Sequence, residues 1–468
     1  TAPLFGATSS TIQNVDLTNV NIASNGRFSL GAVVCELNAE GAISNCHTSG
    51  TITANNADFS IPEDVDHITG VRFAGIVGFS AGDITDCHNE INITVNQLAK
   101  SDTAKAYHIG LGGIVGYSTS TGKLTNCVNG NEAKTTGLIK YLDNTASMLH
   151  VPHIGGIAGF RSTSNNLELS NNTNYGAIEF NANAAGNGTG SYESTSIGGI
   201  TGSTQGILNN NHNHGSITVA GGNIKALFLG GVAGTAKAPT LTKCHNDGAI
   251  SIKSPVRFWT IIVAGVAAHA PYSVKNEDII TELTNNAPIV VEASTASDAP
   301  INNNYNYRIA GVVGYTNRTI QDCENKENGD ITLSGNITLL RNDPQSGFNV
   351  AGVYAYNSTT GAPKNNINRG DINVYTNVSK HSSLTSTTPE ADKENRIMYR
   401  LDIGGVTSHV QLAPVGKEEN FGNITIGKAD GTKMSITANG IYIGGVIGQR
   451  HTRGVGADSS AVNHGHIT

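Results

Sequence analysis

The stretch Gly112-Gly113-Ile114-Val115-Gly116 decides how this chain folds, because close copies of it recur along the 468-residue sequence. In each copy two small residues precede an aliphatic residue, and we take the second small residue as the anchor of the repeat. The anchors are Ala32, Gly75, Gly113, Gly156, Gly199, Gly231, Gly265, Gly311, Gly352, Gly405 and Gly445. Their mean spacing of about 41 residues is typical of solenoids, propellers and other repeat arrays.

The residues just before each anchor alternate between apolar and polar. The residue two positions before the anchor is apolar in every copy, and a second, mostly apolar column lies two residues earlier. Between these columns stand Ser29, Arg72, His153, Ser196, Arg308, Asn349 and Asp402. A period of two predicts a β-strand whose polar residues face water.

A second signature follows about fourteen residues after the anchor, as in the stretch 243–250, Lys-Cys-His-Asn-Asp-Gly-Ala-Ile. Asn fills its turn position, usually with Gly two places later, and both residue types accept the backbone of a tight turn. We expect these Asn side chains to form a buried or half-buried ladder that bonds to turn backbone and to itself. They are Asn89, Asn129, Asn174, Asn213, Asn246, Asn325, Asn368, Asn420 and Asn463. One copy departs from the pattern at Pro288, which we align with the turn Gly.

Each copy therefore predicts strand, turn, strand, Asn turn, strand and a variable loop. This is the unit of an all-β fold, a parallel β-solenoid of about eleven to twelve coils, in which equal positions lie about 4.8 Å apart. A propeller is the rival fold, but it rarely exceeds eight blades and the chain has a single Trp. Residues 1–468 form one array, and because both ends fall inside repeats we expect a fragment of a longer protein.

Composition narrows the classes of function. Lys and Arg number 29 against 36 Asp and Glu, a net charge of −7, so there is no basic field to attract nucleic acid. No run of apolar residues is long enough to span a membrane, and the longest, 258–268, is expected to be a buried strand. Gly-rich runs such as 110–113 lack the lysine of a phosphate-binding loop, and no cofactor is predicted.

The two signatures together, Gly-Gly-Ile-Val-Gly followed by Asn-Cys-x-Asn-x-Gly-x-Ile, resemble the GLUG repeat of secreted and surface-anchored bacterial proteins, including adhesins. The resemblance covers nearly the whole chain. It implies a β-helix on the exterior of a cell, either at the surface or secreted, and it carries no catalytic residues. The function that it implies is a structural or adhesive segment. Its partners would be protein or glycan on a cell or matrix surface, or further copies of itself.

Cysteine and histidine residues follow the repeat. Five of the six cysteines share one slot, and ladder neighbours point the same way, so we expect buried free thiols in place of disulfides. His47, His88 and His245 each follow such a Cys, but adjacent strand residues face opposite sides and cannot close on one ion. We expect His212, His214, His464 and His466 to lack a common face, and we predict no metal site.

Candidate functional residues lie on the outside. Asp330 and Asp371 share a slot one coil apart, near the carboxylate spacing of retaining glycosidases, so a polysaccharide-degrading enzyme is one alternative. Their other interpretation is a strand with solvated charges. Phe228, Ile262 and Trp259 would form an apolar patch for a partner or ligand, unless the next coil covers them.

Long insertions at 55–69, 180–195, 290–304 and 373–400 are expected to be exposed loops, where recognition by a rigid array usually resides. A passive stalk, spacer or fibre-forming segment is the remaining alternative.

Overall fold

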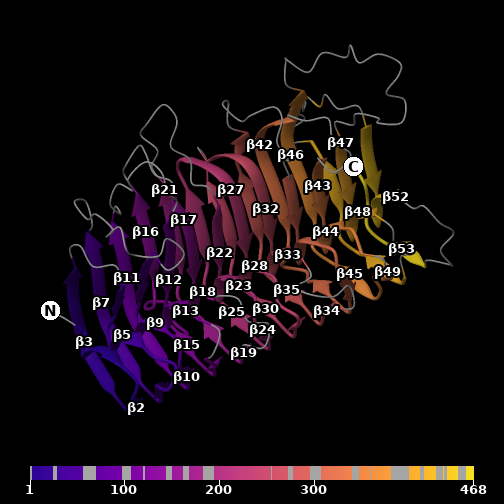
Figure 1. Cartoon of the computed structure of the whole chain (residues 1–468). Helices are drawn as coiled ribbons and strands as arrows, with labels where there is room; N and C mark the ends of the chain where they lie inside the picture. Colours follow the sequence, from indigo (N-terminus) through magenta and orange to yellow (C-terminus); the bar gives the residue numbers. More distant parts are fainter. Residues whose placement is uncertain are drawn as a thin grey trace, which may run out of the picture.

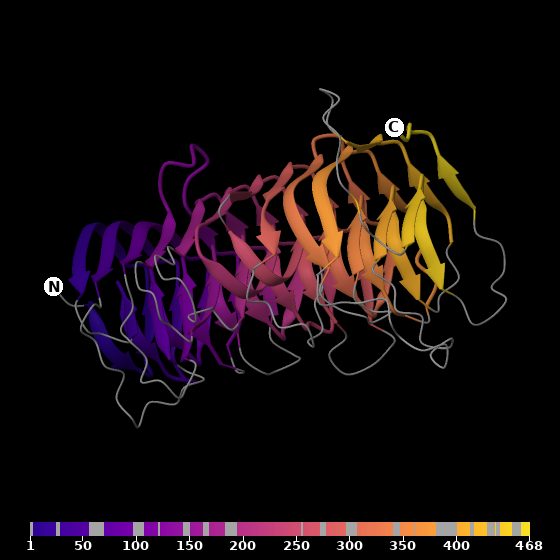
Figure 2. The same cartoon turned by 90° about the horizontal axis from the view of Figure 1, so that it is seen from above.

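The computed structural model describes residues 3–24, 29–55, 70–96, 107–119, 122–143, 150–161, 168–182, 194–253, 256–271, 278–295, 307–339, 347–359, 361–380, 400–411, 416–427, 436, 440–451 and 460–468. Within these residues the chain is all-β and builds four parallel sheets, A to D, whose strands stack in sequence order. The result is an elongated β-solenoid running from an indigo N-terminal end to a yellow C-terminal end (Figures 1 and 2). No helix in the described residues could cross a membrane.

One coil contains five strand segments. Its order is β12 (Tyr107–Gly112) in sheet D, β13 (Val115–Ser118) in sheet A, β14 (Leu124–Thr125) in sheet B, and then β15 (Val128–Asn129) and β16 (Ile139–Asp143) in sheet C. The anchor Gly113 lies in the turn between β12 and β13. The predicted unit of three strands is therefore correct in order but lacks the short strands of sheet B and the Asn strands of sheet C.

Sheets A and D run the length of the solenoid. Sheet A contains β1 (Phe5–Thr8), β5 (Val34–Leu37), β9 (Val77–Ser80), β13, β18 (Ala158–Arg161), β23 (Thr201–Thr204), β28 (Ala233–Ala236), β33 (Ala267–Ala270), β39 (Val313–Thr316), β44 (Tyr354–Asn357), β48 (Thr407–Gln411) and β52 (Ile447–His451). Sheet D contains β4 (Ser29–Gly31), β8 (Val71–Ala74), β12, β17 (His150–Gly155), β22 (Thr195–Gly198), β27 (Asn223–Gly230), β32 (Arg257–Ala264), β38 (Tyr307–Ala310), β43 (Gly347–Ala351), β47 (Arg400–Gly404) and β51 (Gly440–Gly444), with β37 (Ser294–Thr295) beside β32. The twelve strands of sheet A confirm the expected number of coils.

Sheets B and C complete the coils. Sheet B contains β2 (Thr11–Gln13), β6 (Ala42–Ser44), β10 (Asp83–Thr85), β14, β19 (Glu168–Ser170), β24 (Ile207–Asn209), β29 (Leu241–Thr242), β34 (Ile279–Thr281) and β40 (Thr319–Gln321). Sheet C begins with the long strands β3 (Asp16–Ser24), β7 (His47–Asn55) and β11 (His88–Asn96), and then divides into two rows. The Asn row is β15, β20 (Thr173–Asn174), β25 (His212–Asn213), β30 (His245–Asn246), β35 (Thr284–Asn285), β41 (Glu324–Asn325), β45 (Asn366–Asn368), β49 (Glu418–Asn420) and β53 (Ala461–Asn463). The second row is β16, β21 (Ile178–Ala182), β26 (Ile217–Ala220), β31 (Ile250–Lys253), β36 (Ile289–Glu292), β42 (Ile331–Leu339), β46 (Ile372–Lys380) and β50 (Ile424–Ile426).

The interior contains two separate apolar cores. One lies between sheet D and the second row of sheet C, where Leu111 and Ile139 are fully buried. The other lies between sheets A and B and the cysteine slot, which is the position two residues before the ladder Asn. Val115, Leu124 and Cys127 pack together there. The Asn row and the anchor glycines belong to neither core. Each coil therefore contributes to two apolar cores. The backbone and amide groups of the anchor turn and of the Asn row belong to neither of them.

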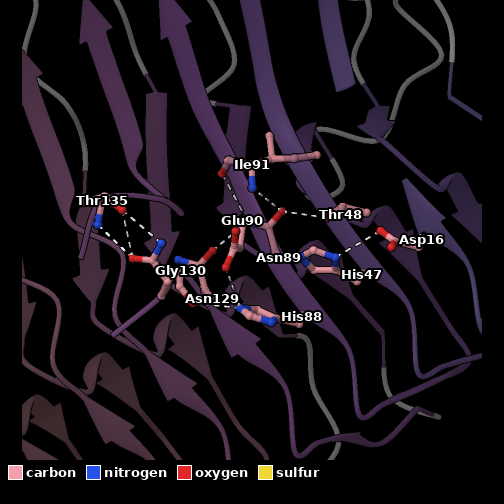
Figure 3. A network of polar contacts seen from close by, with 11 residues as sticks. Asp16, His47, Thr48, His88, Asn89, Glu90, Ile91, Asn129, Gly130 and Thr135 are labelled. Carbon is pink, nitrogen blue, oxygen red and sulfur yellow. Dashed lines mark hydrogen bonds and ion pairs between the residues drawn. The ribbon is translucent and has the colours of Figure 1, made fainter. Parts of the chain in front are cut away.

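The Asn ladder is confirmed, and it is longer than predicted. Nδ2 of each Asn donates to Oδ1 of the Asn one coil later, at 2.7–2.8 Å, from Asn89 through Asn129, Asn174, Asn213, Asn246, Asn285, Asn325, Asn368 and Asn420 to Asn463. Thr48 Oγ1 begins the chain of bonds by donating to Asn89 Oδ1 at 2.9 Å (Figure 3). All members are buried except Asn463, which is exposed.

Each ladder amide also holds its own turn, and the anchor glycine makes room for it. Nδ2 of Asn213, for example, donates to the carbonyl of Gly215 at 2.9 Å. A Cβ on the anchor Gly199 would lie 2.1 Å from Cγ of Asn213 and 2.2 Å from the carbonyl oxygen of Gly231, so only glycine fits there. The anchor that is not glycine is Ala32, and its coil carries Thr48 in the ladder slot in place of Asn.

The polar column of sheet D corrects the prediction that these residues face water. Ser29, Arg72, His153, Ser196, Arg308, Asn349 and Asp402 are all buried. The chain turns so sharply at the anchor that the outer face of sheet A packs against that of sheet D. A Cβ on Gly116 of β13 would come within 2.8 Å of the backbone nitrogen of Phe73 in β8. We name this packed region the A–D corner.

Two local predictions also change. Residues 258–268 form parts of two strands, β32 and β33, with the anchor Gly265 in the turn between them, because anchor turns interrupt apolar runs as well. The register pairs Ile250 with Ile289, which places Ala287 opposite the turn glycine Gly248, so Pro288 does not occupy that position. Asn285 therefore belongs to the ladder, and its Nδ2 bonds to the carbonyl of Ala287 at 2.9 Å.

The expectation of free thiols is confirmed. All six cysteines lie in the described residues and none of them forms a disulfide there, and Cys46, Cys87, Cys127, Cys244 and Cys323 are buried. A side-chain hydrogen bond with Cys127, together with burial, raises the pKa of Cys87 to about 12, and burial raises the pKa of Cys244 to about 11. Cys87 and Cys244 are therefore protonated core residues.

Candidate functional site

Asp330 and Asp371 lie one coil apart, immediately before β42 and β46, as their shared slot predicts. Both carboxylates already bind backbone. Oδ1 of Asp330 accepts the N–H of Asp371 at 2.8 Å, and Oδ1 of Asp371 accepts the N–H and the side-chain amide of Asn423 at 2.7 and 3.1 Å. This arrangement caps the turns of successive coils and explains why acidic residues occupy the slot.

The expected apolar patch does not form as a continuous surface. Ile262 is 2% exposed, because β39 of the next coil covers it: a Cβ on Gly314 would lie 2.4 Å from Cγ2 of Ile262. Phe228 stacks on His269 with ring centroids 5.1 Å apart. Trp259 packs on the first core, and Nζ of Lys225 lies 5.4 Å from the centroid of its indole ring. Of the two interpretations that the sequence leaves open, coverage by the next coil is therefore the one that holds for Ile262.

A column of aromatic residues lies along the A–D corner, four positions after the anchors. We call it the aromatic stripe, and it consists of Phe79, Tyr117, Phe160, His269, Tyr315, Tyr356 and His409. Successive rings are 4.8–5.8 Å apart within each of two runs, which Ser203 and Thr235 separate. Tyr117, Tyr356 and His409 are buried, whereas the other four rings are partly exposed.

Arginines from the polar column of sheet D cover several of these rings. The guanidinium of Arg72 lies 4.7 Å from the centroid of Phe79, and that of Arg308 lies 4.6 and 4.2 Å from the rings of Tyr315 and Tyr356. Cation–π contacts of this kind are stronger where water is excluded. They explain how charged residues can be buried in the corner.

Histidines gather on the outer face of the Asn row, in two places. In the first, Nδ1 of His47 lies 3.1 Å from Oδ1 of Asp16, and Nε2 of His88 lies 2.9 Å from the carbonyl oxygen of Gly130 and 3.7 Å from Oε1 of Glu90 (Figure 3). In the second, Nε2 of His212 lies 2.7 Å from Oδ2 of Asp247 and Nδ1 of His214 lies 3.5 Å from the same oxygen.

The second place corrects the sequence prediction that His212 and His214 lack a common face. They flank the buried Asn213 and therefore point to the same side of β25. His464, in the last coil, stacks on Phe421, and His466 lies apart from both groups, its backbone N–H bonded to Asn423. His245 lies beside His212, with ring centroids 5.6 Å apart.

One ionisable group is buried near the C-terminal coils. Glu418 in β49 occupies the cysteine slot and accepts a bond from Nδ2 of Asn366 at 2.9 Å, while Oε2 has no hydrogen-bond partner among the described residues. Burial raises the pKa of this carboxyl well above its usual range. The nearby phenol of Tyr354 is also buried and its pKa is raised well above 10, chiefly by the same cause.

We call His212, His214 and Asp247 the His212 cluster. The sequence does not predict the aromatic stripe or this cluster, although both leave a signal in the repeat alignment. The stripe is visible as a column four residues after the anchors. His214 and Asp247 share a slot one coil apart, with His212 two residues before His214. Most of the insertions proposed as recognition loops lie outside the described residues, and their described ends, such as Phe180 and Val290, belong to strands.

No family model, curated protein or solved structure matches the chain. The resemblance to the GLUG repeat stays a prediction.

Proposed function

We propose that this chain is an extracellular segment of a bacterial surface protein that binds protein or glycan partners along a rigid repeat scaffold. The observation that carries the proposal is the aromatic stripe, a periodic row of rings in the A–D corner of which Phe79, Phe160, His269 and Tyr315 are partly exposed. Exposed aromatic side chains offer a binding partner a large apolar contact area, and they lose little conformational entropy when they are held in place. Repetition of modest contacts on one stiff rod favours avidity over any single strong site.

The packing of the first core supports the same proposal, because the described residues fill it closely. An internal cavity of about 10 Å³ lies between Phe258, Ile261 and Phe348 in the first core, space for roughly one water molecule. The carboxyl of Glu418 is fully buried and accepts its bond from Nδ2 of Asn366. Close packing of this core fits recognition by an exterior surface.

The two stacked carboxylates do not favour the enzyme alternative. Oδ1 of Asp330 and Oδ1 of Asp371 each accept a backbone N–H of the next coil. This structural role accounts for the position of both carboxylates without a catalytic role. A glycosidase needs one carboxyl to donate a proton and the other to attack or activate water. The extracellular bacterial setting rests on the resemblance to the GLUG repeat.

The proposal is tested by measuring binding of the purified chain to arrays of glycans and matrix proteins, and to itself. The informative variant is Phe79→Ser with Phe160→Ser, because Ser203 occupies the equivalent slot naturally and the fold accepts serine there. We expect binding to fall strongly in this variant and to persist in the control Ser203→Ala.

Binding that is unchanged in the double variant would refute the stripe as the contact surface. Turnover of a cell-surface polysaccharide that disappears in Asp330→Asn with Asp371→Asn would replace the proposal with the enzyme alternative.

A further inference from the structure

The His212 cluster brings three potential metal ligands to one point on the outer face of the Asn row. His212 and His214 belong to one coil and Asp247 to the next, and their ligand atoms all lie within 4.8 Å of one another. All three side chains are between a quarter and about a third exposed, so an ion can reach them from solvent. The buried Asn213 and Asn246 beside them fix the two backbones through the ladder bond at 2.8 Å.

The distances are close to what a tetrahedral ion requires. Zn²⁺ bonds of 2.0–2.2 Å place neighbouring ligand atoms about 3.4 Å apart. Nδ1 of His214 is already 3.5 Å from Oδ2 of Asp247. Nε2 of His212 is 2.7 Å from that oxygen, a hydrogen bond, so its proton moves to Nδ1 or to solvent when the ion replaces it.

Neighbouring side chains hold the ligands in place. The ring of His214 stacks on Tyr175 with centroids 4.8 Å apart and planes within 8°. His245, one coil beyond His212, packs edge-on against its ring. The cluster at His47, His88 and Glu90 is less suited, because the backbone carbonyl of Gly130 already takes Nε2 of His88.

We propose that His212, His214 and Asp247 bind one divalent transition-metal ion of the Zn²⁺ class. Two imidazole nitrogens and one carboxylate oxygen are ligands that Zn²⁺ prefers. Three protein ligands leave a coordination position open to the exterior. The ion links two successive coils, and the inference is independent of the binding function proposed for the aromatic stripe.

The test uses the whole chain, stripped of metal with a chelator and titrated with Zn²⁺ by calorimetry at pH 7.5. Carbethoxylation of histidines, read by peptide mass spectrometry, reports which rings the ion protects. We expect protection of His212 and His214 and a stoichiometry that falls by one ion per chain in Asp247→Asn and in His212→Asn.

The matched control is His464→Asn, which changes a histidine in the same column as His214, outside the cluster, and should leave the titration unchanged. Circular dichroism of each variant verifies that the solenoid is intact. We expect the variants to fold, because the substituted side chains are partly exposed. Protection confined to His47 and His88, or a stoichiometry unaffected by Asp247→Asn in a folded protein, would overturn the proposal.

Discussion

Two columns of side chains run side by side inside the solenoid, and they differ in how much variation they accept. The ladder slot holds Asn in ten successive coils, from Asn89 to Asn463. The slot two residues earlier is the cysteine slot described above, and we call it the mixed slot because it accepts several residue types. Its buried members are Cys46, Cys87, Cys127, Asn172, Asn211, Cys244, Leu283, Cys323, Asn366 and Glu418. Burial alone therefore does not determine which residue a slot requires.

The difference lies in the number of buried polar groups that each slot must satisfy. A ladder Asn donates to its own turn and to the next coil, and it accepts from the coil before, so three groups lose partners if it is replaced. In the mixed slot the thiols make only weak contacts, such as that of Sγ of Cys244 with the carbonyl of Thr242 at 3.3 Å. Leu283, which has no polar atom in its side chain, is accepted there, so the slot does not require a hydrogen-bonding group.

The largest expected effect comes from crowding the ladder. Gly75→Ala places a Cβ 1.9 Å from Oδ1 of Asn89 and 2.6 Å from the carbonyl oxygen of Gly113, and should cost at least about 3 kcal/mol in the free energy of unfolding. Adding Asn89→Thr recreates the Ala32 and Thr48 pair of the preceding coil and should recover part of that loss. Urea unfolding of the two single variants and the double variant measures the coupling. Additive costs would show that the glycine and the amide are independent.

Removal of one ladder amide ranks second. Asn213→Leu leaves Nδ2 of Asn174, the carbonyl of Gly215 and Oδ1 of Asn246 without their partner, and should destabilise by about 1–3 kcal/mol. The matched control is Asn377→Leu, which removes a similar amide-to-amide bond at an exposed site and should have little effect. Equal losses in the two variants would contradict the role assigned to burial.

The buried carboxyl in the mixed slot gives a pH-dependent effect. Because the pKa of Glu418 is raised in the folded state, its contribution to stability is complete below the unfolded pKa of about 4.5 and is lost as the pH rises toward the folded pKa. Glu418→Gln keeps the bond from Asn366 and stays neutral, so its melting temperature should gain on the parent protein as the pH increases from 4 to 9. Glu419→Gln, on the outer side of the same strand, is the control. A constant difference across this range would contradict a neutral Glu418.

The smallest effect is expected for a thiol. Cys244→Ala removes one buried sulfur atom and no strong hydrogen bond, so it should cost about 1 kcal/mol. Urea unfolding of this variant next to Asn246→Ala, two residues away in the same coil, compares the two slots directly. A larger loss for the thiol than for the amide would reverse the comparison.

The repeat pattern predicts the parallel solenoid, its register and most of the ladder, because backbone geometry forces equal positions to stack. Asn285 was missed since Ala287 removes the glycine that marks the turn. The polar column around Arg72 was assigned to solvent because a period of two gives only the alternation of faces and not what packs against the outer face. The His212 cluster depends on how side chains from two coils meet, which spacing along a single coil does not reveal.

The central claim is that buried amide-to-amide bonds hold the coils in register, and hydrogen exchange of the Asn side chains tests it most directly. In protein labelled on Asn, NMR should find the Nδ2 protons of Asn213 and Asn246 exchanging orders of magnitude more slowly than those of Asn377, which makes an exposed bond to Asn336 at 3.0 Å. Exchange of the ladder amides as fast as that of Asn377 would contradict the claim.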